Sequence, residues 1–312
     1  MLTATRLWTA IITPLDQSGS LDLKSFEGLL RDQEKAGNGI VILGSTGEGL
    51  NLSESEKKKI VEFTDELNLQ VPVMVGISGF HLESTLDWID YLESRPGIHC
   101  YLVVTPLYAK PGTEGQYHWF KSILDRSTRP CMLYNVPSRT GVAMSKEAVE
   151  RLRLHPQFWS IKEASGSVKE FCDYRDNTQG QQMYSGDDGL MPDFAEHGCF
   201  GLVSVSANVW PLATKLYVEL AAQSQLSAEE IQLWKEATNA LFTAANPIPT
   251  KALLFSQGRI QSAHLKAPLH LEDLRDMAPL NRADKAINDW YHRRSGRSEQ
   301  EGLLGGLNDL HA

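Results

Sequence analysis

The sequence contains few cysteines, and the four that are present lie far apart. Cys100, Cys131, Cys172 and Cys199 form no CxxC pair and have none of the Cys/His spacings that bind zinc. A short secreted protein held together by disulfides would use cysteine more densely. We therefore expect reduced thiols in a soluble, cytoplasmic protein.

Several other patterns are also missing. No run approaches the eighteen or more apolar residues of a membrane helix, and the N-terminal segment lacks the apolar core of a signal peptide. The formal net charge of −9 gives no general attraction for nucleic acid or for an anionic membrane. The nine histidines form no HxH or HExxH pattern, so we predict no metal site and disfavour a metal-dependent aldolase. Asp187 and Asp188 lack further ligands at a suitable spacing, and we expect them to begin a helix instead.

What the sequence does contain is a repeated pattern of short apolar runs separated by helical segments. Eight such runs begin at intervals of roughly 18 to 33 residues, and one strand plus one crossover helix needs about 30 residues. The runs are almost continuously apolar, which is typical of parallel strands covered on both faces. They begin near Leu7, Gly39, Val71, His99, Pro130, Trp159, Gln182 and Phe200.

Eight such units can close into a barrel or remain an open doubly wound sheet. An open sheet would usually carry GxGxxG after its first strand, but Thr13-Pro14-Leu15 stands there. We therefore predict an α/β fold, a (β/α)8 TIM barrel with a C-terminal helical appendage. The predicted division is a catalytic barrel over residues 1–225, a helical region over 226–294 and a flexible tail over 295–312. Within the appendage, helices are expected at 228–242, 250–256, 271–277 and 282–291.

In a (β/α)8 barrel, catalytic groups lie at the C-terminal ends of the strands. Lys162 lies near the end of the sixth apolar run, where burial of an unpaired ammonium is unfavourable. Burial lowers the pKa of an amine and makes it a nucleophile towards a ketone. A structural lysine paired with a carboxylate is an equally good interpretation from position alone. Glu163 is expected to point to the other side of the strand, so it is not the obvious partner.

Other strand ends supply weaker candidates. Tyr134 ends the preceding run and could transfer protons, although a buried tyrosine more often has only a structural hydrogen bond. Ser45 and Thr46 lie between glycines, where backbone N–H groups can bind a carboxylate, or they form a plain turn. Arg139 follows in a loop and could hold a second carboxylate bidentately, although most loop arginines are only solvated.

Taken together, these segments resemble the dihydrodipicolinate synthase family of pyruvate-dependent class I aldolases, a class that also includes N-acetylneuraminate lyase. The resemblance covers residues 4–292, in the order and at the spacing typical of the family. Each motif alone is unspecific, but the set is specific. The motifs are GSTGE (44–48), VTPLYAKP (104–111), YNVPSRTG (134–141), IKEASG (161–166), SGDD (185–188), GLVSVSAN (201–208) and NPIPTK (246–251).

The resemblance implies an enzyme of lysine and diaminopimelate biosynthesis, a carbon–carbon lyase that works through a lysine Schiff base and usually forms a homotetramer of two tight dimers. Its partners would be pyruvate and L-aspartate-4-semialdehyde, which condense to 4-hydroxy-tetrahydrodipicolinate. No metal or organic cofactor is implied, because the imine itself activates pyruvate.

The resemblance also implies a role for each matching residue. Lys162 would form the imine, and Tyr134 would donate and accept protons. Ser45 and Tyr108 would complete a proton relay, with Tyr108 contributed across the tight dimer. The implied substrate-binding residues are Thr46, Gly186 and the backbone of Val203 for pyruvate, and Arg139 for the semialdehyde carboxylate.

Two alternatives stay open. Ser45 in place of the usual threonine also occurs in N-acetylneuraminate lyases, so a lyase or aldolase acting on a sugar acid is one alternative. Those lyases normally lack an arginine at the position of Arg139, which favours the synthase. The other alternative is a non-catalytic protein that senses a keto acid, which the joint presence of Lys162, Tyr134, Ser45 and Tyr108 disfavours.

Lysine is expected to inhibit this protein weakly or not at all. Lysine-inhibited members of the family carry a second tyrosine before the relay tyrosine, and an asparagine and a glutamate at the start of the third crossover. Leu107, Phe80 and Ser84 occupy these places, with Glu83 adjacent to the last. Inhibition measured against lysine concentration tests this, and half-maximal inhibition well below the millimolar range would contradict it.

Overall fold

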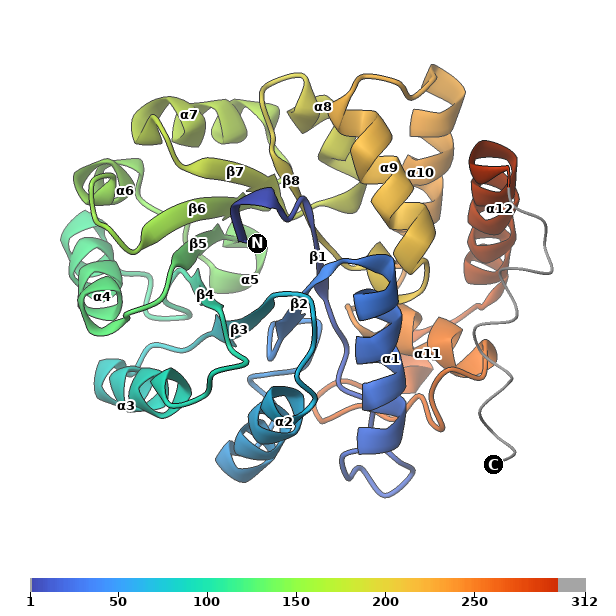
Figure 1. Cartoon of the computed structure of the whole chain (residues 1–312), viewed down its shortest axis with the longest axis horizontal. Helices are drawn as coiled ribbons and strands as arrows, with labels where there is room; N and C mark the ends of the chain where they lie inside the picture. The colour runs from blue at the N-terminus through green and yellow to red at the C-terminus, as the bar shows by residue number, and fades with distance from the viewer. Residues whose placement is uncertain (1, 297–312) are drawn as a thin grey trace.

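The computed structural model describes residues 2–296, and its centre is a closed barrel of eight parallel strands in sequential order (Figure 1). The predicted (β/α)8 barrel is therefore confirmed, and each apolar run of the sequence contributes one strand. The strands are β1 (Leu7–Ala10), β2 (Gly39–Ile42), β3 (Val73–Ile77), β4 (Cys100–Val104), β5 (Cys131–Asn135), β6 (Phe158–Glu163), β7 (Gln182–Ser185) and β8 (Gly201–Ser204).

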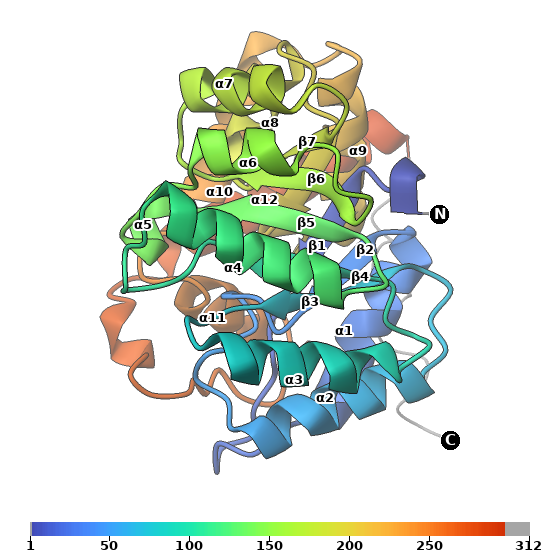
Figure 2. The same ribbon diagram turned by 90° about the vertical axis from the view of Figure 1, so that its left-hand side faces the viewer.

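The crossover helices surround the barrel, and Figure 2 shows α2, α3, α4, α6 and α7 covering one side of it. Several begin where the sequence supplies a cap. Ser53 forms a capping box with Glu56 at the start of α2, and Ser145 caps α6. The helices of the barrel are α1 (Leu23–Ala36), α2 (Glu54–Glu66), α3 (Leu82–Glu93), α4 (Thr113–Arg126), α6 (Lys146–Leu152), α7 (Val168–Thr178), α8 (Met191–Ala195) and α9 (Pro211–Ala222).

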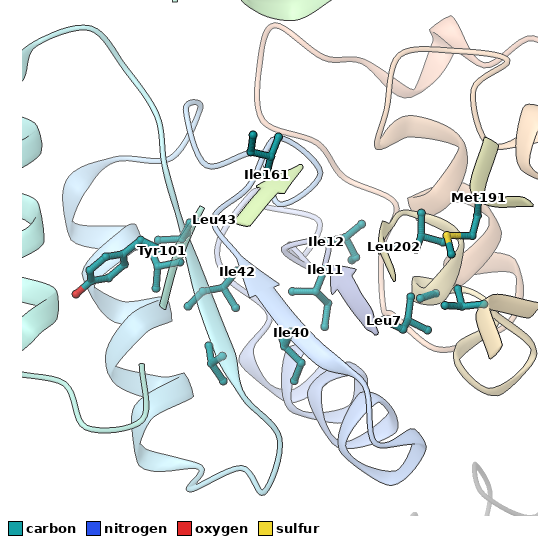
Figure 3. Close-up of a cluster of buried hydrophobic side chains, with 14 of the residues drawn as sticks. Leu7, Ile11, Ile12, Ile40, Ile42, Leu43, Tyr101, Ile161, Met191 and Leu202 are labelled. Atoms are coloured by element: carbon teal, nitrogen blue, oxygen red, sulfur yellow. The ribbon is translucent and has the colours of Figure 1, made fainter. Parts of the chain in front are cut away.

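The strands bury both of their faces, as continuous apolar runs require. The larger apolar cluster lies between the barrel and its helices, and Figure 3 shows part of it, with Ile40 and Ile42 of β2 and Leu202 of β8. The smaller cluster fills the barrel interior with side chains such as Val41, Met132 and Val203. Alternate residues of each strand therefore serve two separate cores.

Aromatic side chains close the N-terminal end of the barrel. Trp159, near the start of β6, makes edge-on contacts with Trp8 and Tyr184 at centroid distances of 6.0 and 5.8 Å. Tyr184 also contacts Phe200, and its hydroxyl donates a hydrogen bond to the carbonyl of Thr5. This packing leaves the C-terminal end of the barrel as the open end, where polar side chains can meet a ligand.

Beyond the barrel, three helices form the predicted C-terminal helical part: α10 (Ala228–Ala240), α11 (Ile248–Ser256) and α12 (Ala278–Ser295). The helix expected at 271–277 is wrong, because only the short 3-10 helix η4 (Leu271–Asp273) forms there. Leu271 is exposed, and Leu274 and Met277, which pack against the core, are only half-buried, so the segment buries too little apolar surface to stabilise a longer helix. The helix α12 continues to Ser295, and the rest of the expected tail lies outside the described residues.

The proposed boundary between the barrel and the helical region at residue 225 stays a prediction. It falls between α9 and α10, while Trp234 of α10 stacks on Tyr217 of α9 at 4.2 Å and so joins the two parts. No helix within residues 2–296 combines the length and the apolar character that crossing a membrane requires.

Candidate active site

Lys162 lies on β6 directly beside Tyr134 of β5. The two residues are paired in the register of the parallel strands, so both side chains point to the same face of the barrel wall. The Lys162 Nζ atom lies 4.2 Å from the centre of the Tyr134 ring. The prediction that these side chains approach each other is therefore confirmed.

Lys162 is buried, with 5% of its surface exposed, and among the described residues it makes no ion pair. Burial lowers its pKa from the ordinary value to about 8, and Arg139 adds to this effect. The carboxylates of Asp187 and Asp188 oppose it. At pH 7.5 a pKa near 8 leaves roughly a quarter of the amine neutral, against about one part in a thousand for an unperturbed lysine.

The neighbouring carboxylate, Glu163, does not neutralise Lys162. It points away from the barrel interior, as expected from strand alternation, and accepts hydrogen bonds from Asn135 Nδ2 and from the backbone N–H of Ser165, both at 2.7 Å. Burial raises the pKa of Glu163. Its hydrogen bonds fix the end of β6 from outside and leave the amine of Lys162 unpaired.

Gly186, after β7, provides the space that Lys162 occupies. A Cβ atom at this position would lie 2.8 Å from Lys162 Cε and 2.6 Å from the Ala164 Cβ, closer than carbon atoms approach without displacement. Its backbone N–H donates to the carbonyl of Glu163 at 2.7 Å. Any larger residue here would displace the lysine side chain.

The glycine-flanked loop after β2 contributes two hydroxyl groups with different surroundings. Thr46 is buried, and its Oγ1 atom accepts a hydrogen bond from Asn246 Nδ2 at 2.9 Å. Ser45 is exposed and lines a cavity of about 300 Å³ at the C-terminal end of the barrel. Lys162, Tyr134, Arg139 and Asn246 line the same cavity.

Arg139 reaches this cavity from α5 (Pro137–Thr140), a single helical turn where the sequence suggested a loop. It also lines a second, shallower cavity with Tyr108 and Lys110. Tyr108 itself is 88% exposed and is absent from the wall of the Lys162 cavity. Within one chain, therefore, the fold unites Lys162, Tyr134, Ser45 and Arg139 but places Tyr108 outside.

The comparisons with known proteins agree with this geometry. The family model described as "Dihydrodipicolinate synthetase family" matches residues 3–282. The chain belongs to this family. It is 47% identical to the 4-hydroxy-tetrahydrodipicolinate synthase of Francisella philomiragia over 286 residues, which is 92% of this chain and 97% of that protein.

Solved structures of the same family have the same fold. The 4-hydroxy-tetrahydrodipicolinate synthase from Methylacidiphilum fumariolicum SolV superposes with a TM-score of 0.88 at 28% identity, covering 94% of this chain and 98% of that one. A chloride-inhibited dihydrodipicolinate synthase from Acinetobacter baumannii, solved in complex with pyruvate, gives a TM-score of 0.85 at 31% identity. That match covers 91% of this chain and 99% of the other.

The structure refines the prediction that Asp187 and Asp188 begin a helix. Asp188 does begin a short 3-10 helix, η2 (Asp188–Leu190), but its buried carboxylate makes no helix cap. It accepts hydrogen bonds from the Ser204 and Ser206 hydroxyls and from the backbone of Val205 and Ser206. Asp188 thus connects the end of β7 to the end of β8, beside Val203.

Val203 is buried inside the barrel, and its side chain packs in the interior cluster. It is paired with Trp8 across the junction that closes the barrel between β1 and β8. It does not line the Lys162 cavity, so its expected contact with pyruvate through the backbone stays a prediction.

The sequence did not single out Asn246, Glu48 or Lys251 as site residues, although all three lie in family motifs. Glu48 and Lys251 form a completely buried ion pair with Oε1 and Nζ 2.5 Å apart. Asn246 and Lys251 lie in the C-terminal helical region, outside the strand ends from which the candidates were chosen. The polar residues within the otherwise apolar motif NPIPTK (246–251), which leads into α11, could have indicated Asn246 and Lys251.

Within residues 2–296, no three His, Cys, Asp or Glu side chains gather in a cluster that could hold a metal ion. Asp187 and Asp188 have no third such partner there. Burial raises the pKa of Asp187, and the charge of Lys162 opposes this rise. The negative charge of Asp187 therefore acts electrostatically and favours the protonated form of Lys162.

The pKa of Lys162 can be measured from the rate at which a small amine-reactive electrophile labels it as a function of pH, with labelling followed by mass spectrometry of the peptide. We expect a midpoint near 8, because the neutral amine is the reactive form. Asp187→Asn should move the midpoint to lower pH, since it removes a charge that stabilises the ammonium. A midpoint near the ordinary lysine value, or a shift to higher pH in the variant, would contradict the electrostatics described.

Proposed function

We propose that this protein condenses pyruvate with L-aspartate-4-semialdehyde through a Schiff base on Lys162 and releases 4-hydroxy-tetrahydrodipicolinate for diaminopimelate and lysine biosynthesis. Membership of the family and the synthase name of the Francisella relative support this proposal. The observation that carries it is a buried lysine without an ion-pair partner in residues 2–296, in contact with a buried tyrosine. A merely structural lysine would be paired.

The first half of the reaction needs a neutral amine and a proton shuttle. The amine of Lys162 attacks the ketone carbon of pyruvate, and water leaves to give the imine. Loss of a proton from the methyl group then gives an enamine, which is a carbon nucleophile. Tyr134 is the proposed proton donor and acceptor, and burial raises the pKa of its phenol, which keeps it protonated in the free enzyme.

The second half joins the carbon chains. The enamine carbon attacks the aldehyde carbon of the semialdehyde, and the aldehyde oxygen takes up a proton. The amino group of the new chain then attacks the imine carbon and displaces Lys162, which closes the ring. The net reaction releases one water molecule. Because the imine itself activates the methyl group of pyruvate, we propose that no metal or organic cofactor takes part.

The carboxylates of the two substrates would be bound by different residues, and of the proposed ones only Arg139 is among the residues that line the Lys162 cavity. Thr46, Gly186 and the backbone of Val203 are the proposed contacts of pyruvate, and the pyruvate complex of the Acinetobacter protein supports a keto acid at this end of the barrel. Arg139, exposed at the cavity wall, is the proposed partner of the semialdehyde carboxylate.

We also propose that Ser45 and Tyr108 complete the proton relay and that Tyr108 acts in the site of a neighbouring copy. Its 88% exposure supports this assignment. Leu50 and Phe80 are also exposed, at 54% and 62%, on the loops after β2 and β3, next to the Tyr108 loop after β4. Large exposed apolar side chains on adjacent loops are typical of an interface, consistent with a tight dimer within a homotetramer in the cytoplasm.

Turnover of pyruvate with several aldehydes tests the proposal. We expect a product whose mass equals pyruvate plus L-aspartate-4-semialdehyde minus one water, and little turnover with neutral sugar aldehydes. Arg139→Ala should lower kcat/KM for the semialdehyde roughly 10- to 100-fold, since it removes a charged hydrogen bond worth about 1.5–3 kcal/mol. The KM for pyruvate should change far less.

Arg153→Ala is the matched control for this experiment. Arg153 is also an exposed arginine, but it follows α6 at the opposite end of the barrel and donates to the carbonyl of Glu150. It should leave both KM values unchanged. Efficient turnover of a sugar aldehyde, or an Arg139→Ala variant with unaltered kcat/KM, would favour a different aldolase.

A further inference from the structure

We propose that Asn246, in the C-terminal helical region, is a positioning residue for the pyruvate site, because its amide donates to the Thr46 hydroxyl and leaves the proton of that hydroxyl free for the pyruvate carboxylate. The inference rests on the proposed function and adds to it a residue 200 positions away from its target in sequence. On this proposal the C-terminal helical region contributes directly to pyruvate binding through Asn246.

The hydroxyl of Thr46 is the group on which Asn246 acts. A threonine hydroxyl has one proton to donate and can rotate to suit its neighbours. Asn246 Nδ2 donates to Thr46 Oγ1 at 2.9 Å, and both residues are at least 95% buried. Because this N–H group points at the oxygen, the hydroxyl proton must point elsewhere. The hydroxyl is thereby set up as a donor to an anion such as a carboxylate.

The same contact joins the loop to the cavity wall. Asn246 lines the Lys162 cavity, together with Pro268 and Leu269, which follow in the C-terminal region. The hydroxyl of Thr13 donates to the carbonyl of Gly47 at 2.7 Å on the other side of the loop. The loop is therefore held by the segment after β1 on one side and by the helical region on the other.

A buried ion pair anchors the two segments to each other. Lys251 of α11, five residues after Asn246, pairs with Glu48 at 2.5 Å and donates to the carbonyl of His264 at 2.8 Å. The other carboxylate oxygen of Glu48 accepts from the backbone N–H of Lys266 at 2.7 Å. Glu48 also has a positive φ of 54°, a backbone conformation that its buried contacts must maintain.

The ion pair between Glu48 and Lys251 is better explained by its effect on the position of the two segments than by a contribution to the free energy of unfolding. Fully buried pairs contribute little net stability, because desolvation of both charges offsets their attraction. The ammonium of Lys251 does compensate the negative charge of Glu48, which lines a cavity that is proposed to bind an anion. The ion pair also fixes the position of Asn246 relative to Thr46, because Glu48 and Lys251 belong to the same two segments.

The dissociation constant of pyruvate, measured by titration calorimetry on the full chain, tests the proposal without the aldehyde. Asn246→Ala should raise this constant roughly tenfold, the loss of about one charged hydrogen bond. Asn246→Asp should raise it further, because a carboxylate can only accept and would itself take the hydrogen bond from the Thr46 hydroxyl that is proposed to bind pyruvate. The KM for the aldehyde should stay within a factor of two.

The decisive comparison is a double-mutant cycle with Thr46→Val. If Asn246 acts through the hydroxyl, adding Asn246→Ala to Thr46→Val should change the pyruvate constant less than twofold. An equal effect of Asn246→Ala in both backgrounds would overturn the proposal, and so would wild-type pyruvate affinity in the Asn246→Ala and Asn246→Asp variants.

Gln257→Ala is the matched control. Gln257 also donates a side-chain amide hydrogen bond in the helical region, to Asp284 Oδ1 at 2.9 Å, but it touches neither the loop nor the cavity. It should lower thermal stability without altering the pyruvate constant. Failure of the proposed condensation would show separately, as pyruvate binding by the wild-type protein without turnover of the semialdehyde.

Discussion

The burial of one ammonium group without a partner is the constraint on which the site depends. A pKa near 8 for Lys162 corresponds to about 3 kcal/mol of destabilisation of its charged form relative to water. The other deeply buried lysine, Lys251, is treated differently: it forms an ion pair with Glu48 and donates to a carbonyl. One buried lysine of this protein is thus stabilised by an ion pair, whereas the other stays unpaired within residues 2–296 and is the proposed reactive amine.

The barrel makes this unfavourable burial possible. Aromatic packing around Trp8, Trp159 and Tyr184 closes one end, and the apolar interior excludes water below the lysine. Gly186 leaves space for the side chain, and Glu163 is held outside by Asn135 and Ser165. Stability supplied by two large apolar cores therefore offsets the local destabilisation that makes the amine nucleophilic.

Much of this arrangement could be predicted from the sequence. The regular spacing of the apolar runs locates the C-terminal ends of the strands, and Lys162 and Tyr134 lie at two of these ends. The family membership inferred from the motifs is confirmed by the comparisons. The contact of Asn246 with Thr46 could not be predicted in this way, since it joins segments 200 residues apart and depends on how the helical region docks. The helix expected at 271–277 does not form for a related reason: Leu271 stays exposed, and Leu274 and Met277 are only half-buried against the core. Tyr108 shows a third limit, because its proposed role requires a second copy of the chain.

The most direct test of the central claim is to identify the residue that forms a covalent adduct with pyruvate. Borohydride reduction in the presence of pyruvate, followed by peptide mass spectrometry, should add the reduced pyruvyl group to Lys162 and leave Lys251 unmodified. Loss of the adduct in Lys162→Ala should accompany loss of turnover. An adduct on another lysine, or full turnover without any adduct on Lys162, would contradict the account.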